Sequence, residues 1–192
     1  MKNRIEKLFQ RKSRNILSVY FTAGYPELND TVNIIRYLDE AGADMIEIGI
    51  PFSDPVADGP VIQNSSRIAI RKGMTLDLLF SQLEYIRRYT GIPLLLMGYM
   101  NPVLQFGEEK FIKTCIDTGI DGVIIPDMPP EYFAGKLRSK YRSAGLFNIL
   151  LISSDTTNER IHMIDKLSNG FIYMVSPGAT TGGLLRPEPA KA

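Results

Sequence analysis

Apolar and polar positions along the chain alternate between two periods. Short runs of apolar, often β-branched residues are each followed by a longer stretch with apolar residues three or four positions apart, a spacing typical of helices. The pattern predicts strands at residues 16–21, 45–50, 94–97, 122–125, 147–152 and 171–175. It predicts helices at residues 3–12, 28–41, 61–71, 76–89, 109–117, 130–144 and 158–167.

This alternation predicts an α/β fold with a parallel sheet, because the strands are apolar on both faces and helices separate them. A doubly wound sheet and a (β/α) barrel both fit the periodicity. Polar or conformationally special residues follow strand after strand, as expected of a barrel that builds its active site at the carboxyl ends of its strands. An open sheet would concentrate them at one switch point. These segments are residues 22–24, 51–60, 98–102, 126–127, 153–157 and 176–183.

Composition narrows the possible functions. The 22 basic and 21 acidic residues balance, so no electrostatic argument supports binding to nucleic acid or to a membrane surface. Cys115 is the only cysteine, which excludes an internal disulfide and fits a reducing compartment. The first residues are charged and lack an apolar signal core, and no apolar run reaches the ~20 residues that span a bilayer. These features predict a soluble, cytoplasmic protein.

The chain has little material for metal or triad chemistry. His162 is the only histidine, and it falls in the middle of a predicted helix. One histidine and one cysteine leave zinc sites and nucleophilic triads almost without ligands or bases. Neither a G-x-G-x-x-G nor a Walker pattern is present, so nucleotide binding has no support.

Residues 45–63 hold the strongest candidate chemistry. Glu47 stands in the middle of an apolar run, where a carboxylate is costly unless it is paired or used. Strand alternation predicts that Ile46 and Ile48 face the helices, while Met45, Glu47 and Gly49 face the barrel interior. Burial would raise the pKa of Glu47, which suits a general acid or base near neutral pH. The alternative is a structural glutamate paired with a polar neighbour.

Two aspartates follow in the loop after this strand. Asp54 precedes Pro55, and Asp58 precedes Gly59, so both also fit ordinary turn chemistry. A later loop, residues 176–183, is small and polar. It could close over a ligand or present N–H groups to a phosphate, or it could simply be a loop near the chain end.

Several stretches together resemble the tryptophan synthase α-subunit family. The run IEIGIPFSDPVADGPVIQ at residues 46–63 matches the family signature almost residue for residue and is highly specific. The resemblance covers roughly residues 1–183. Supporting matches are residues 21–26, 97–102, 126–129, 173–176 and 180–182.

The resemblance implies a (β/α)8 barrel, a lyase of tryptophan biosynthesis that cleaves indole-3-glycerol phosphate to indole and glyceraldehyde 3-phosphate by retro-aldol chemistry. Glu47 would be the acid and base acting on indole C3 and on a glycerol hydroxyl. Asp58 would accept a hydrogen bond from the indole N–H. The implied indole pocket is lined by Phe21, Met97, Tyr99 and Ile152. The implied groups that orient the two acids are Tyr173 and Thr181.

The family also implies a partner. No metal or organic cofactor is expected in this chain, and pyridoxal phosphate would belong to a β subunit in an α2β2-type complex. Docking would use the loop at residues 51–58 together with Asn101 and Pro102, and indole would pass between the subunits.

One departure from the family concerns the substrate phosphate. The seventh and eighth strands of the family carry the loops that hold it, and this sequence has no counterpart to them. We therefore expect about six βα units in a barrel domain at residues 1–183, followed by a disordered or non-family tail at residues 184–192. The polypeptide alone is expected to have weak or no lyase activity. The alternative function is a catalytically defective module that only docks on a β subunit. A different phosphate-sugar barrel enzyme would not need the signature from Glu47 to Asp58.

Overall fold

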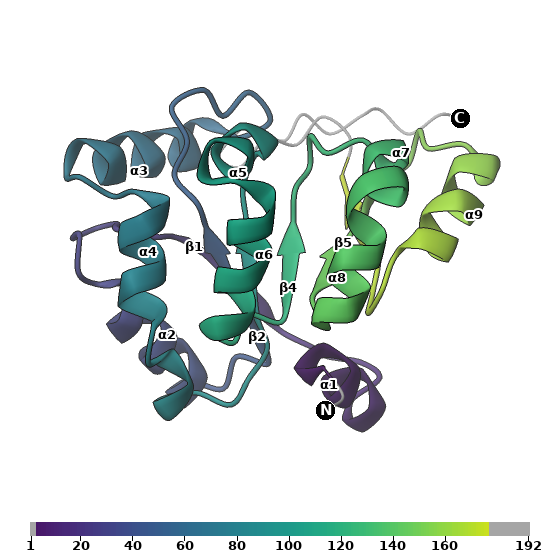
Figure 1. Cartoon of the computed structure of the whole chain (residues 1–192). Helices are drawn as coiled ribbons and strands as arrows, with labels where there is room; N and C mark the ends of the chain where they lie inside the picture. The colour runs from purple at the N-terminus through teal and green to yellow at the C-terminus, as the bar shows by residue number, and fades with distance from the viewer. Residues whose placement is uncertain (1–2, 177–192) are drawn as a thin grey trace, which may run out of the picture.

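The structure is a computed structural model that describes residues 3–176 (Figure 1). Five strands form one sheet in the order β1-β2-β3-β4-β5, with every neighbouring pair parallel. A second, two-stranded parallel sheet pairs β6 with β7. The strands are β1 (Ser18–Thr22), β2 (Met45–Gly49), β3 (Leu94–Met97), β4 (Gly122–Ile124), β5 (Phe147–Ile149), β6 (Leu151–Ser153) and β7 (Tyr173–Val175). The predicted parallel α/β architecture is confirmed, while the predicted boundary at residue 183 lies outside the described residues.

Helices follow nearly every strand, and Figure 1 shows α2 to α9 together on one side of the sheet. None of the described helices is both long and apolar enough to cross a membrane. The helices are α1 (Arg4–Arg11), α2 (Thr31–Glu40), α3 (Pro60–Arg71), α4 (Leu76–Leu83), α5 (Met100–Phe106), α6 (Glu108–Asp117), α7 (Pro130–Tyr132), α8 (Arg138–Ala144) and α9 (Asn158–Leu167). Two short segments complete them, a 3₁₀ turn at Ile86–Arg88 and a π turn at Phe133–Leu137.

The structure differs from the predicted elements in several places. The helix predicted at residues 76–89 ends at Leu83, and a separate 3₁₀ turn follows at Ile86–Arg88. The strand predicted at residues 147–152 is split, because Leu150 leaves the five-stranded sheet and accepts a hydrogen bond from the Tyr173 N–H at 2.9 Å. The segment after β3, for which no helix was predicted, contains α5. Pro102 does not prevent this helix, since it lies in the first turn, where no backbone donor is needed. Gly107, with φ at 93°, separates α5 from α6.

Side-chain alternation sorts the core into two layers. Ile46 and Ile48 pack in the outer layer, between the sheet and the helices. Met45 packs in the inner layer with inward residues of the neighbouring strands and with Ile5 and Leu8 of α1. The predicted facing of these β2 residues is confirmed, and α1 covers the lower end of the inner face (Figure 1).

A buried ion cluster ties the lower ends of the strands together. The Asp121 carboxylate is 3% exposed and accepts hydrogen bonds from Arg87 at 2.5 Å, from Arg4 at 3.1 Å and from the Leu94 N–H at 3.0 Å. Asn3 also donates to the Asp121 carbonyl at 2.8 Å. One carboxylate therefore connects α1, the turn before β3 and the start of β4. These contacts lie at the amino-terminal ends of the strands, which in β/α barrels contribute to stability rather than to catalysis.

Replacing Asp121 with alanine should destabilise the fold by about 3–5 kcal/mol, since Arg87 would remain buried without its counter-charge. Urea unfolding followed by circular dichroism measures the loss. Asp117→Ala is the matched control, because it removes an exposed i,i+4 pair with Lys113 and should cost less than about 0.5 kcal/mol. Equal losses for the two variants would contradict the special role of Asp121.

Candidate active site

Glu47 occupies the middle of β2, the strand in which every residue is buried. Its side chain is 3% exposed, and its Oε1 accepts a hydrogen bond from the Ser18 hydroxyl at 2.5 Å. Burial raises the pKa of Glu47, and the Ser18 hydrogen bond only partly opposes that effect. The carboxyl group therefore stays protonated at a pH where an exposed glutamate has ionised.

Asp58 lies in the loop between β2 and α3. Its N–H donates to the Pro55 carbonyl at 3.1 Å and its carbonyl accepts from the Gln63 side chain at 2.9 Å, so its backbone does form a turn. Pro60 then begins α3, with φ already suited to a helix. Burial raises the pKa of the Asp58 carboxyl group, and a hydrogen bond with Tyr99 opposes the rise. The turn interpretation is therefore correct for the backbone of Asp58, while its side chain lines the pocket beside Tyr99.

Tyr99 fixes this loop against the residues that follow β3. Its hydroxyl accepts the Ala57 N–H at 3.0 Å and is hydrogen-bonded to Asp58. Its ring also packs on Phe52, with the ring centroids 5.2 Å apart. Burial raises the pKa of Tyr99 to about 12, and the charge of Asp58 adds to the rise. The phenol is therefore a neutral hydrogen-bonding partner for Asp58.

A narrow pocket opens beside Asp58 at the carboxyl ends of β1, β2 and β3. Its volume is about 20 Å³, enough for roughly one water molecule. An indole ring therefore requires movement of the lining side chains or of the loop. The lining residues are Tyr20, Ile50, Asp58, Met97, Gly98, Tyr99 and Pro126.

The structure places the predicted pocket residues on two different faces. Met97 and Tyr173 pack on the inner layer, and the pKa of Tyr173 is raised by burial and by the charge of Glu47. Phe21 and Ile152 pack against outer clusters, away from Glu47. Thr181 lies outside the described residues.

The sequence analysis missed Tyr20 and Leu151, the inward-facing residues that precede Phe21 and Ile152. Tyr20 lies directly opposite Glu47 in the β1–β2 pairing, and Leu151 packs on the inner layer opposite Tyr173. A shift of one position moves a strand residue to the other face of the sheet. Aligning β1 with the predicted facing of Glu47 could have identified Tyr20.

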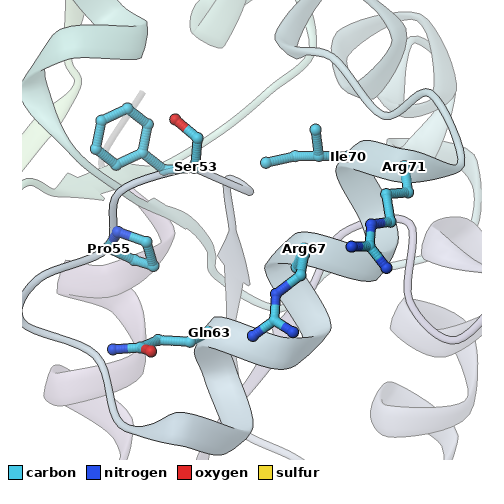
Figure 2. Close-up of a pocket in the computed structure, with 7 residues that line it drawn as sticks. Ser53, Pro55, Gln63, Arg67, Ile70 and Arg71 are labelled. Carbon is cyan, nitrogen blue, oxygen red and sulfur yellow. The ribbon is translucent and has the colours of Figure 1, made fainter.

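A second and wider hollow lies on the outer side of the loop after β2 (Figure 2). It measures about 200 Å³ and is lined by Phe52, Ser53, Pro55, Gln63, Arg67, Ile70 and Arg71. Figure 2 shows the two guanidinium groups on successive turns of α3. Neither arginine pairs with a carboxylate in the part of the chain that the structure describes.

This hollow continues into a groove of about 400 Å³ that shares Phe52, Ser53 and Ile70 and reaches Asn101 and Pro102. Four exposed apolar side chains lie on the segments that form the two hollows: Ile70 lines both hollows, and the others belong to the loop after β2, to α3 and to α5. The four are Val56, Val61, Ile70 and Leu104, with exposed fractions of 88%, 57%, 37% and 50%.

The parallel strands, with one buried acid inside β2 and a second acid in the loop at its carboxyl end, fit the β/α-barrel class of enzymes. Residues 7–186 match the family model for the tryptophan synthase alpha chain. The chain belongs to this family of lyases, which acts in tryptophan biosynthesis.

The relatives agree with the family model. The chain is 56% identical to the tryptophan synthase alpha chain of Flavobacterium psychrophilum over 180 residues, covering 94% of this chain and 71% of that one. The Legionella pneumophila alpha subunit structure has a TM-score of 0.86 and 37% identity, covering 92% of this chain and 68% of that chain. A Mycobacterium tuberculosis tryptophan synthase structure has a TM-score of 0.87 and 31% identity, covering 95% and 71%. The predicted family and barrel fold are confirmed.

Glu47→Gln should make the protein more stable at neutral pH. Because the native pKa of Glu47 is raised above its ordinary value of 4.5, the native state binds this proton more tightly than the unfolded state. The free energy of unfolding of the wild type therefore falls as pH rises through this range. Glutamine keeps the acceptor for Ser18 and has no charge, so its advantage should vanish near pH 4 and be complete above the native pKa. Urea unfolding between pH 4 and pH 8 measures this difference.

Glu109→Gln is the control for that experiment. Glu109 is an exposed glutamate whose pKa is lowered by Lys140, so its replacement should give a small change of the opposite sign. A Glu47→Gln advantage that does not vary with pH would contradict the assignment of a buried, pKa-raised carboxyl group.

Proposed function

We propose that this chain carries the acid–base site that cleaves indole-3-glycerol phosphate to indole and glyceraldehyde 3-phosphate. The observation that carries the proposal is the pair formed by Glu47 and Asp58. Both have raised pKa values because of burial, and they come from β2 and from the loop that follows it. Membership of the tryptophan synthase alpha chain family supplies the substrate class.

Glu47 suits the proton transfers at carbon and oxygen. A carboxyl group of raised pKa can hold a proton near neutral pH and give it to indole C3. The resulting carboxylate can then take the proton of the glycerol hydroxyl. As that proton leaves, the carbonyl of glyceraldehyde 3-phosphate forms, and the bond from the glycerol carbon to indole C3 breaks with its electron pair returning to the ring. Glu47 ends the cycle protonated, as it began.

Asp58 suits the stabilisation of positive charge. Protonation of C3 places charge on the indole nitrogen, and a carboxylate that accepts the N–H hydrogen bond stabilises it. The Tyr99 hydrogen bond favours the ionised form of Asp58, whereas Glu47 is more completely buried. Unlike surroundings thus fit one acid to hold a proton and the other to stay charged.

The remaining residues have supporting roles in this proposal. Met97, Tyr99 and Leu151 bound the apolar part of the site, and Tyr173 lies near Glu47. Thr181 stays a prediction from the family resemblance, while Phe21 and Ile152 are withdrawn as pocket residues. The steps are proton transfers and one bond cleavage, so the proposal invokes no metal or organic cofactor.

Indole release from indole-3-glycerol phosphate tests the reaction. We expect slow release by the wild-type chain, and a further loss of about 10²–10⁴-fold in Glu47→Gln, since a positioned acid–base group contributes this much. Asp58→Asn should also lower the rate strongly, because the indole N–H loses its anionic partner. Asp54→Asn is the matched control: this neighbouring carboxylate is exposed, accepts from Ser53, and lies outside the pocket lining.

The alpha chain of Flavobacterium psychrophilum serves as the positive control. Equal rates for the wild type and Glu47→Gln would contradict the proposed chemistry. Stimulation of a β subunit without any indole release would instead support the alternative of a module that only docks.

We also propose a tryptophan synthase β subunit as the partner, in an α2β2-type complex that carries pyridoxal phosphate on the β subunit. One related structure, from Pyrococcus furiosus, is described as a tryptophan synthase complex. The two hollows share Phe52 and Ile70, and together with the exposed apolar side chains of the same segments they offer a docking surface. This surface includes Asn101, Pro102 and the loop at residues 51–58.

Charge reversal on α3 tests the docking surface. The double variant Arg67→Glu, Arg71→Glu should weaken binding to the β subunit at least tenfold in a titration, because both cations line the hollow. Lys136→Glu with Arg142→Glu makes the same change of charge in the π turn and in α8, and it should leave the affinity within twofold. Equal weakening by both double variants would show a non-specific effect of net charge.

A further inference from the structure

Tyr20 lies between the two acids of the proposed site, and no step of the proposed mechanism uses it. The residue stands opposite Glu47 in the strand register and lines the pocket with Asp58. Its phenol crosses the β2 backbone at Gly49, where even a Cβ atom would lie against the hydroxyl. Glycine at position 49 therefore leaves the space that the Tyr20 side chain fills.

A chain of buried hydroxyl groups anchors the phenol. Tyr20 is hydrogen-bonded to Thr22, two residues along the same face of β1. The Thr22 hydroxyl lies 2.7 Å from the Ser65 hydroxyl, and Ser65 donates to the Ile62 carbonyl at 2.9 Å. Thr22 and Ser65 are 4% and 6% exposed, so water does not compete for these bonds.

The last member of this chain is a carbonyl oxygen, which only accepts, so Ser65 is the donor to Ile62. Either hydroxyl group can be the donor between Thr22 and Ser65. The bond with Thr22 opposes the effect of burial on the pKa of Tyr20. The phenol hydroxyl group also lines the pocket, where it can form a further hydrogen bond. Burial, with the nearby charges of Asp58 and Glu47, raises the pKa of Tyr20 to about 12, so this oxygen stays neutral.

We propose that Tyr20 is a substrate-positioning residue whose phenol hydroxyl group, held by Thr22 in the pocket that Asp58 lines, forms a hydrogen bond with a hydroxyl group of the substrate's glycerol chain. This inference rests on the proposed function, in which Asp58 already takes the indole N–H. The phenol oxygen lies at Gly49, two residues further along β2 than Glu47, and so toward the end of the strand where the proposed substrate would enter. In this proposal Tyr20 binds the glycerol chain, and Asp58 binds the indole ring.

Binding of two ligands tests the assignment, indole-3-glycerol phosphate and indole, of which only the first has the glycerol hydroxyl groups. The chain contains no tryptophan, so the fluorescence of the ligand's indole ring reports binding directly. The titrations use a Glu47→Gln background, in which the substrate is not consumed. Tyr20→Phe keeps the ring and removes the oxygen. It should weaken indole-3-glycerol phosphate about five- to tenfold, the loss of roughly one hydrogen bond, and change indole binding by less than twofold.

Two Thr22 variants separate positioning from folding. Thr22→Val removes the anchor of the phenol and should copy the selective loss of Tyr20→Phe, whereas Thr22→Ser retains the hydroxyl and should restore the affinity. Equal losses for both ligands would show a structural effect of the substitution, and no loss for either ligand would also overturn the proposal. Equal affinity for the two ligands in the Glu47→Gln chain with Tyr20 and Thr22 intact overturns it too. Failure of the proposed function is seen separately, as absence of indole release when Glu47 is intact.

Discussion

The register of three adjacent parallel strands is the constraint on which the site depends. Tyr20, Glu47 and Leu95 are aligned across β1, β2 and β3, and Phe21, Ile48 and Leu96 form the next row. In-register residues of neighbouring strands share a face, so the first row points inward and the second toward the helices. A slip of one residue would bring Ile48 into the interior and place the Glu47 carboxyl group among the helices, where it has no partner.

The two ends of the strands have different roles, one in stability and the other in the proposed chemistry. At the lower end, Asp121 holds the start of two strands and α1 through bonds that bury its charge against two arginines. At the upper end, Asp58 and Tyr99 come from the segments after β2 and β3, and the Tyr99 hydroxyl group joins these segments through its bonds with Ala57 and Asp58. A firmly held lower end lets the sheet tolerate Glu47, whose burial favours the neutral form over the charged one.

Much of the fold could be predicted from the sequence, because apolar runs and helical periods differ clearly in a β/α chain. The facing of β2 followed from alternation within a single strand, and it is confirmed. The faces of Phe21 and Ile152 depend on register between strands, which no local pattern contains. The helix after β3 was missed because Asn101 and Pro102 resemble a turn, although proline is well tolerated in a first helical turn. The acid pair was identified from a long motif, whereas the pairing of Ser18 with Glu47 and of Tyr99 with Asp58 required the folded structure.

The two carboxyl groups show why a neutral side chain between them is useful. Both have raised pKa values, so each is sensitive to any further negative charge nearby. An ionised group at position 20 would push both acids toward their protonated forms, and Asp58 could then no longer stabilise a charged indole ring. A phenol of high pKa fills the same space, offers one oxygen, and adds no charge. The glycine at position 49 makes this arrangement possible, since any side chain there would displace the ring from the place between the acids.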